Sequence, residues 1–133
     1  VNQQCNPVIN MTRSPAACVA ARAAEAVASV GGEEAFVQVH DWILSNQDSF
    51  SRSALQQAVQ SMNLDWNAVA SAMMSKTAQD PIDEDCQAGR RIGGIRKIPT
   101  IVINDRRVRR WTIKGENRID LILDAATRDA ASN

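Results

Sequence analysis

The ten residues RKIPTIVIND, 96–105, constrain the fold of this chain more than any other stretch. Before Gly93-Gly94 the apolar residues recur with a helical period, whereas here they form the continuous β-branched run Thr100-Ile101-Val102-Ile103. Such a short run does not make a helix and predicts a buried strand. Pro99 opens the run, at a position where its missing amide costs no ladder hydrogen bond. The chain is therefore expected to combine helices with a small sheet.

The part of the chain before Gly93 predicts a series of short helices. Ser14-Pro15 is typical of a helix start, because serine satisfies an orphan amide and proline loses no bond at the first helical position. Gly31-Gly32 is typical of a helix end. Ser53, Asp65 and Asp80-Pro81 are further candidate starts. The expected helices are residues 16–30, 33–45, 54–62, 66–75 and 81–92.

The C-terminal part predicts a hairpin and a closing helix. Asn104-Asp105 is a turn signal, and residues 107–113 alternate between arginines and apolar side chains, as a strand with one solvated face does. A helix over about 116–128 would carry its apolar residues on one stripe, namely Ile119, Ile122, Leu123 and Ala126. The expected fold class is α/β or α+β, with residues 1–133 as one domain, since this length suits a single core.

Composition excludes few classes of protein. The chain has 15 basic and 15 acidic side chains, so its total charge predicts no particular partner, although residues 90–114 are locally basic. No run approaches the roughly 18 apolar residues of a membrane span, and no signal peptide opens the sequence. Because the sequence starts at Val1 rather than at Met, we expect a processed or shortened N-terminus.

Cysteine usage points away from a metal site. The three cysteines are Cys5, Cys18 and Cys86, no two of them form a Cys-x-x-Cys pair, and His40 is the single histidine. Neither zinc nor another cofactor is expected from these residues. His40 is expected to be a half-buried helical residue bonded to the backbone or to a neighbouring acid. Cys86 follows three acids that disfavour a thiolate, and burial as a small apolar side chain is expected.

Cys5 and Cys18 leave three interpretations open. A structural disulfide would close a short loop and stabilise the fold by about 2–3 kcal/mol. Two separate thiols would also satisfy the sequence. In the third interpretation Cys18 is catalytic, because it lies near a helix start, where the helix dipole favours a thiolate.

Longer stretches resemble a known family. GGIRKIPTIVINDRRV, 93–108, resembles the C-terminal half of thioredoxin-fold proteins. CNPVINMTRSPAACVAARAAEAV followed by GGEEAFVQVHDWILSNQ resembles the DsbA-like branch, including the domains linked to vitamin K epoxide reductase homologues. The resemblance implies a cis peptide bond at Ile98-Pro99 and a substrate-facing loop of Ile98, Pro99 and Thr100. It also implies a thioredoxin-like sheet flanked by the first and last helices, with a helical insertion at about 33–92.

The departure from the family bears on function. A complete member begins with a strand and a helix that carries the Cys-x-x-Cys, whereas this sequence begins where the second strand should end. We therefore expect an N-terminally truncated thiol–disulfide oxidoreductase domain whose reactive pair lies outside the segment. The resemblance implies a bacterial, exported, extracytoplasmic protein that acts on cysteine-containing or extended polypeptides. An uncovered sheet edge would then pair with another chain, such as a second copy in a homo-oligomer.

Two other function classes remain open. A thioredoxin-like domain without its cysteine pair can serve as a non-catalytic binding or assembly module. The arginines of 106–110 with Trp111 could instead bind nucleic acid through phosphate contacts and base stacking. Their alternation with apolar residues is also that of an ordinary solvated edge strand, which makes nucleic-acid binding the weaker hypothesis.

Overall fold

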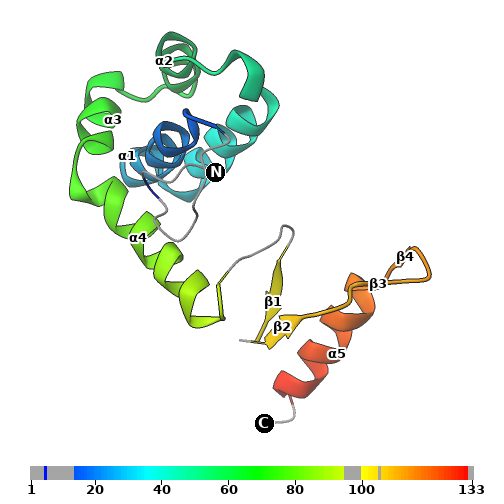
Figure 1. Cartoon of the computed structure of the whole chain (residues 1–133). Coiled ribbons are helices and arrows are strands. Elements are labelled where there is room, and N and C mark those ends of the chain that lie inside the picture. Colours follow the sequence, from blue (N-terminus) through cyan, green and yellow to red (C-terminus); the bar gives the residue numbers. More distant parts are fainter. Residues whose placement is uncertain (1–4, 6–13, 95–99, 105, 132–133) are drawn as a thin grey trace. The chain divides into compact units, whose positions relative to one another are not determined.

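The computed structural model describes Cys5 and residues 14–94, 100–104 and 106–131. The chain divides into two compact units, residues 1–87 and 88–133, and the boundary falls inside helix α4 (Lys76–Arg91). The first unit is helical, and the second holds two short hairpins and a helix (Figure 1). Within the described residues, five α-helices and two two-stranded sheets make a mixed α/β fold rich in helix, as predicted.

Helix α1 (Ala17–Ser45) unites two of the predicted helices. Its backbone leaves helical geometry only at Gly32, with φ 80° and ψ −172°, so the predicted interruption is confirmed and the chain resumes the helix directly after it. The predicted serine cap is wrong. The helix begins after Ala16 without a side-chain cap, and Ser14 contributes only its carbonyl, which accepts from the Ala17 amide at 3.2 Å.

Helices α2 (Arg52–Ser61) and α3 (Trp66–Met73) follow a single 3-10 turn at Gln47–Ser49. Ser51 caps α2 by accepting from the Ala54 amide at 3.2 Å, so the predicted cap at Ser53 is wrong by two positions. Ser53 lies within the first turn. The cap predicted at Asp65 is confirmed, since its carboxylate accepts from the Asn67 amide at 2.9 Å.

Helix α4 begins earlier than predicted. The Ser75 hydroxyl accepts from the Thr77 amide at 3.2 Å at the start of the helix, which makes Asp80 an interior residue rather than a cap. Pro81 is also interior, so its missing amide removes one bond to the Thr77 carbonyl. An ion pair between Lys76 and Asp80, 3.3 Å apart, spans the same turn. The helix start signal of Asp80-Pro81 is thus overridden by Ser75.

The core of the first unit forms around α1 and α3. Its fully buried members include Ala23, Ala26, Val27, Val39, Leu55, Val59 and Val69. Arg22 of α1 adds polar contacts across the helices: its guanidinium donates to the Met73 carbonyl of α3 at 3.5 Å and to the side-chain oxygen of Gln79 in α4. Small alanines let the backbone of α1 approach its neighbours closely, and one polar residue bridges α3 and α4.

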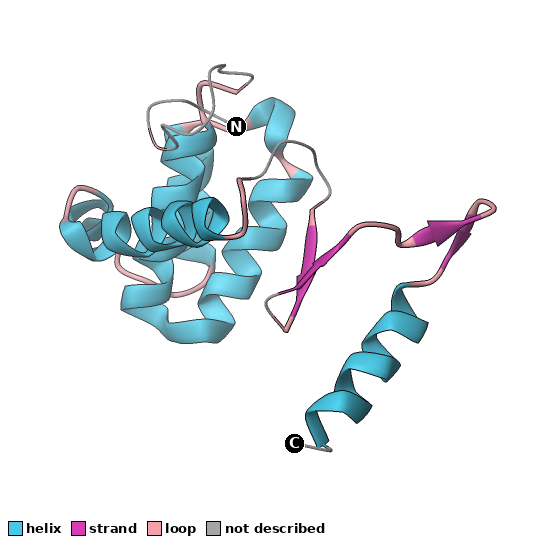
Figure 2. Ribbon diagram, turned by 60° about the horizontal axis from the view of Figure 1, so that its bottom comes forward, coloured by secondary structure: helices cyan, strands magenta, loops and turns pink. Residues whose placement is uncertain are grey.

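The second unit is built from two hairpins and helix α5 (Ile119–Ala131). Strands β1 (Ile101–Ile103) and β2 (Arg106–Val108) are antiparallel, with Val102 opposite Arg107. The side-chain amide of Asn104, in the hairpin turn, donates to the Ala126 carbonyl of α5 at 3.3 Å. The strand predicted at 100–104 is therefore confirmed as a hairpin strand (Figure 2), but its residues Ile101–Ile103 are half-buried rather than buried as predicted.

The predicted strand over 107–113 is confirmed only in its first part, since β2 pairs with β1 as the predicted hairpin partner but ends at Val108. The predicted helix start at 116 is wrong. Strand β3 (Thr112–Ile113) instead pairs with β4 (Glu116–Asn117) across Lys114 and Gly115. Both turn residues have positive φ, 52° and 84°, as a two-residue type I′ hairpin requires. This turn folds Glu116 and Asn117 back as a strand, so α5 starts three residues later than expected.

Replacement of Gly31 by alanine should destabilise the first unit. An added Cβ would lie 2.7 Å from the Ala35 Cβ and 2.9 Å from the Leu64 Cδ1. Overpacking costs about 1–3 kcal/mol, which exceeds the gain of about 0.5–1 kcal/mol for alanine over glycine in a helix. Urea unfolding should give a lower midpoint for G31A. In the L64A background the same change should cost less, and an unchanged cost would show that Leu64 does not set the limit.

Candidate functional site

The predicted substrate loop is only partly described. Ile98 and Pro99 lie outside the described residues, and with them the predicted cis peptide bond. Thr100 is half-buried and leads into β1, and its hydroxyl accepts from the guanidinium of Arg107 at 3.3 Å. Of the predicted loop, Thr100 is thus placed against the facing strand.

A disulfide joins Cys5 to Cys18, with their Cα atoms 5.5 Å apart. Cys18 is the second residue of α1, so the bond attaches Cys5 to the first turn of that helix. Both residues are half-buried. Of the three interpretations open from the sequence, the bridged state is the one that the structure contains.

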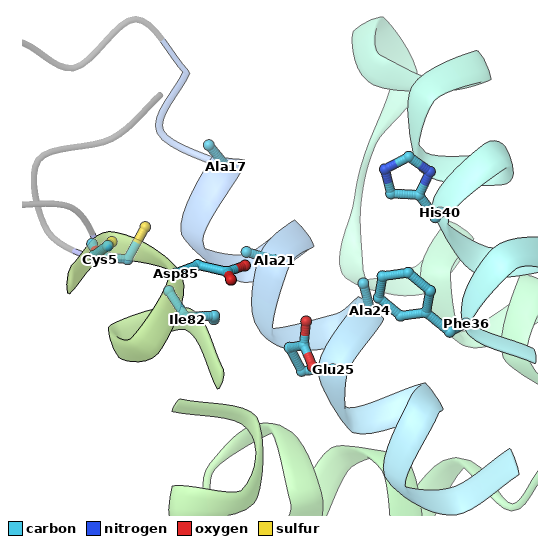
Figure 3. Close-up of a pocket in the computed structure, with 10 residues that line it drawn as sticks. Cys5, Ala17, Ala21, Ala24, Glu25, Phe36, His40, Ile82 and Asp85 are labelled. Carbon is cyan, nitrogen blue, oxygen red and sulfur yellow. The ribbon is translucent and has the colours of Figure 1, made fainter. Parts of the chain in front are cut away.

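A pocket of about 330 Å³ lies beside this disulfide, within the first unit. Residues from both segments of α1 and from α4 line it, and Figure 3 shows Ile82 and Asp85 on α4 near Ala21 on α1. The lining is mostly apolar: Cys5, Ala17, Ala21, Ala24, Glu25, Phe36, His40, Ile82, Asp85 and Cys86. The space exists because α1 presents alanine at three positions, 17, 21 and 24, which recur on one helical face.

The third cysteine, Cys86, lies at the same pocket. Cys86 is present as a thiol, and its sulfur donates to the Cys5 carbonyl oxygen at 3.6 Å, as a weak S–H donor. It is half-buried and lines the pocket, so the predicted burial is only partial. Cys86 and Ile82 are four residues apart in α4, so the helical period brings them to one face of that helix. Cys5 and Cys86 therefore line one pocket, and the disulfide joins Cys18 to Cys5.

Glu25 is the one acid of the alanine-rich segment 17–32 and lines the pocket. Burial raises the pKa of its carboxyl above the ordinary value, and the nearby Asp85 carboxylate raises it further. Across the pocket, His40 stacks on Phe36 with ring centroids 5.8 Å apart. Its Nδ1 lies 3.7 Å from the Asp41 carboxylate, and its side chain is about half exposed. His40 is therefore exposed rather than half-buried as predicted, and the neighbouring acid is the partner that the sequence predicts for it.

The tryptophans and arginines take packing and surface positions. Trp42 and Trp66 pack against the core, Trp42 beside Phe50 and Trp66 under the guanidinium of Arg52 at 5.4 Å. Arg106, Arg107, Arg109 and Arg110 are exposed. In the part of the chain that the structure describes, no group of three or more His, Cys, Asp or Glu side chains is placed to hold a metal ion. No helix there is long and apolar enough to cross a membrane.

Sequence reasoning missed most of the pocket. It offered a bridge between Cys5 and Cys18 as one interpretation, but it did not bring Cys86 or His40 to that pair, and it did not assign Glu25 or Phe36 to a site. One usable signal was present, since alanines at 17, 21 and 24 form a small-residue stripe beside Cys18. The packing of α4 over that stripe depends on contacts distant in the sequence, such as Arg22 with Gln79, and no local pattern encodes them.

Comparison with known proteins gives one match. The family model described as a DSBA-like thioredoxin domain matches residues 4–126, which is nearly the whole chain, and this confirms the resemblance and the fold class drawn from the sequence. No curated protein and no solved structure matches the chain.

The Cys5–Cys18 bond should stabilise the first unit. The bridged residues are 13 positions apart, and closing a loop of this length is worth about 2–3 kcal/mol on the chain-entropy model. We expect dithiothreitol to lower the urea midpoint of the wild-type chain and of C86S alike, and to leave C18S/C86S, which retains Cys5 alone, unchanged. Equal midpoints for the oxidised and reduced wild type would contradict a stabilising role.

Glu25→Gln should make the chain more stable at pH 7. Because the pKa of Glu25 is raised in the folded state, its favourable contribution is present at low pH and is lost as the pH rises through the folded pKa. The gain from E25Q should therefore be largest at neutral pH and shrink below about pH 4. Urea midpoints at both pH values measure this, with E33Q as the control at an exposed position of the same helix. A gain independent of pH would contradict the account.

Proposed function

The chain belongs to the DSBA-like thioredoxin domain family, and from this premise we propose that it serves in thiol–disulfide exchange by binding an extended, cysteine-containing segment of another polypeptide. The observation that carries the proposal is the family match over residues 4–126, which includes the segment that the family resemblance identifies as the substrate loop. That loop is Ile98, Pro99 and Thr100.

The described part of the second unit supports this role. Thr100 leads directly into β1, and among the described strands β1 pairs with β2 alone. Such a strand has a row of backbone groups on its other edge that an extended peptide can bind by adding a strand. Because proline has no backbone amide, the residue before β1 can offer a bound peptide its carbonyl oxygen but no N–H donor. Backbone recognition of this kind tolerates many sequences, as a domain acting on varied polypeptides requires.

The chemical step needs a reactive pair. No Cys-x-x-Cys occurs in the sequence. We therefore propose that Ile98, Pro99 and Thr100 bind the substrate, and that other residues supply the redox pair of the DSBA-type reaction. An oxidising, extracytoplasmic compartment is part of the proposal, supported by the Cys5–Cys18 disulfide, because such bonds persist mainly in those compartments.

Peptide binding tests the proposal. The probe is a fluorescein-labelled, unstructured peptide with one reduced cysteine between apolar residues, titrated with the chain while anisotropy is followed. P99A should raise the Kd about tenfold, a loss of about 1.4 kcal/mol. P15A is the matched control, since Pro15 is an exposed proline of the first unit, and it should leave the Kd unchanged.

Two outcomes would contradict the proposed binding role. The first is no binding by the wild-type chain, and the second is an equal effect of P99A and P15A. A cysteine-to-serine version of the peptide separates the two classes of function. Weaker binding of the serine peptide favours a domain of the oxidoreductase type, whereas equal binding of both peptides favours the non-catalytic adaptor.

A further inference from the structure

Two sulfur centres of different kinds lie side by side in the first unit. One is the Cys5–Cys18 disulfide, and the other is the thiol of Cys86, which is 81 residues from Cys5 in the sequence. The Cys86 sulfur is 3.6 Å from the carbonyl oxygen of Cys5, so it touches the backbone of one of the two bridged residues. Cys5 and Cys86 also line the same pocket.

We propose that Cys5, Cys18 and Cys86 form an internal thiol–disulfide exchange site, in which the Cys86 sulfur attacks the Sγ of Cys5 and displaces Cys18. The chain then exists as two bridge isomers, Cys5–Cys18 and Cys5–Cys86. This inference concerns the first unit alone and does not rest on the proposed peptide-binding role of the second.

The step balances without a further reactant. The Cys86 thiol loses its proton to solvent, and the resulting thiolate forms a bond to the Cys5 Sγ. The Cys5–Cys18 bond breaks, its electron pair leaves on the Cys18 Sγ, and Cys18 takes up a proton from solvent. One disulfide and one thiol are present before and after, so there is no net oxidation or reduction.

The positions of the three cysteines favour Cys5 as the sulfur attacked and Cys18 as the leaving group. Cys18 is the second residue of α1, where the helix dipole stabilises negative charge, and a thiol that is more acidic leaves faster. The Cys86 sulfur donates to the carbonyl oxygen of Cys5, and this contact with Cys5 favours the Cys5 sulfur as the one attacked. Each exchange therefore releases a thiolate at the start of α1.

The surroundings explain why Cys5–Cys18 is the resting bridge. The carboxylates of Glu25 and Asp85 line the same pocket and disfavour negative charge on Cys86. The space of about 330 Å³ beside these residues leaves room for the sulfur of Cys86 to turn from the Cys5 carbonyl towards the Cys5 side chain. The half-buried state of all three cysteines keeps the site partly accessible to solvent, which must take up and return the proton.

A trapping variant tests the exchange directly. C18S removes the resting bridge, and the chain is oxidised with diamide at pH 8, quenched in acid, alkylated and mapped by mass spectrometry under non-reducing conditions. We expect an intramolecular Cys5–Cys86 bridge as the main product, formed at a rate independent of protein concentration. The matched control is C18S/C86S/S71C, which moves the third thiol to an exposed position on α3 outside the pocket lining and should give no intramolecular bridge to Cys5.

Folded C18S that keeps two thiols or forms only intermolecular bridges overturns the proposal, as does equally fast bridging in the control. If circular dichroism shows that C18S does not fold, the wild-type chain is mapped instead after incubation at pH 8 and acid quench. A Cys86-linked peptide should then amount to about 0.1–10% of the bridged material, as for a minor state within a few kcal/mol. Its absence at a detection limit of about 0.1% also overturns the proposal.

Discussion

The small side chains along α1 are the feature on which the first unit depends. Ala23 and Ala26 are fully buried with Val27, so this part of the helix approaches its neighbours as closely as its backbone allows. On the adjoining face Ala17, Ala21 and Ala24 leave space instead of filling it, and the pocket lies there. One alanine-rich helix thus provides both a tight core contact and an open site. Larger residues on either face would remove one or the other.

The same helix organises the chemistry of the unit. Its first turn holds Cys18, its middle holds Glu25, and its second segment returns past the break at Gly32 with Phe36 and His40. The break matters because an uninterrupted helix would carry Phe36 and His40 away along one straight axis. Instead, both segments line one pocket, and α4 closes it with Cys86. Family membership relates the chain to thiol–disulfide oxidoreductases, and the proposed site of three cysteines is one that the family match alone does not describe.

Local signals in the sequence were sufficient for the existence and order of most elements. The β-branched run at 101–103 and the glycine at 32 predicted a strand and a helix break, because both depend on properties of the residues themselves. Competing local signals were not resolved: Ser51 caps α2 in place of Ser53, and Ser75 starts α4 upstream of Asp80-Pro81. The type I′ turn at Lys114-Gly115 was not predicted, because lysine rarely adopts positive φ and is therefore not a turn signal in a sequence. The site was beyond prediction where it depends on contacts between Cys5 and a helix more than 70 residues away.

The redox state of each cysteine in the native chain is the most direct test of this account. The ¹³Cβ chemical shifts of selectively labelled cysteines distinguish disulfide from thiol without unfolding, cleavage or alkylation. In non-reducing buffer we expect disulfide shifts for Cys5 and Cys18 and a thiol shift for Cys86 as the main species. Thiol shifts at all three residues, or a main species with Cys18 reduced and Cys86 oxidised, would contradict the arrangement around α1 from which the site is derived.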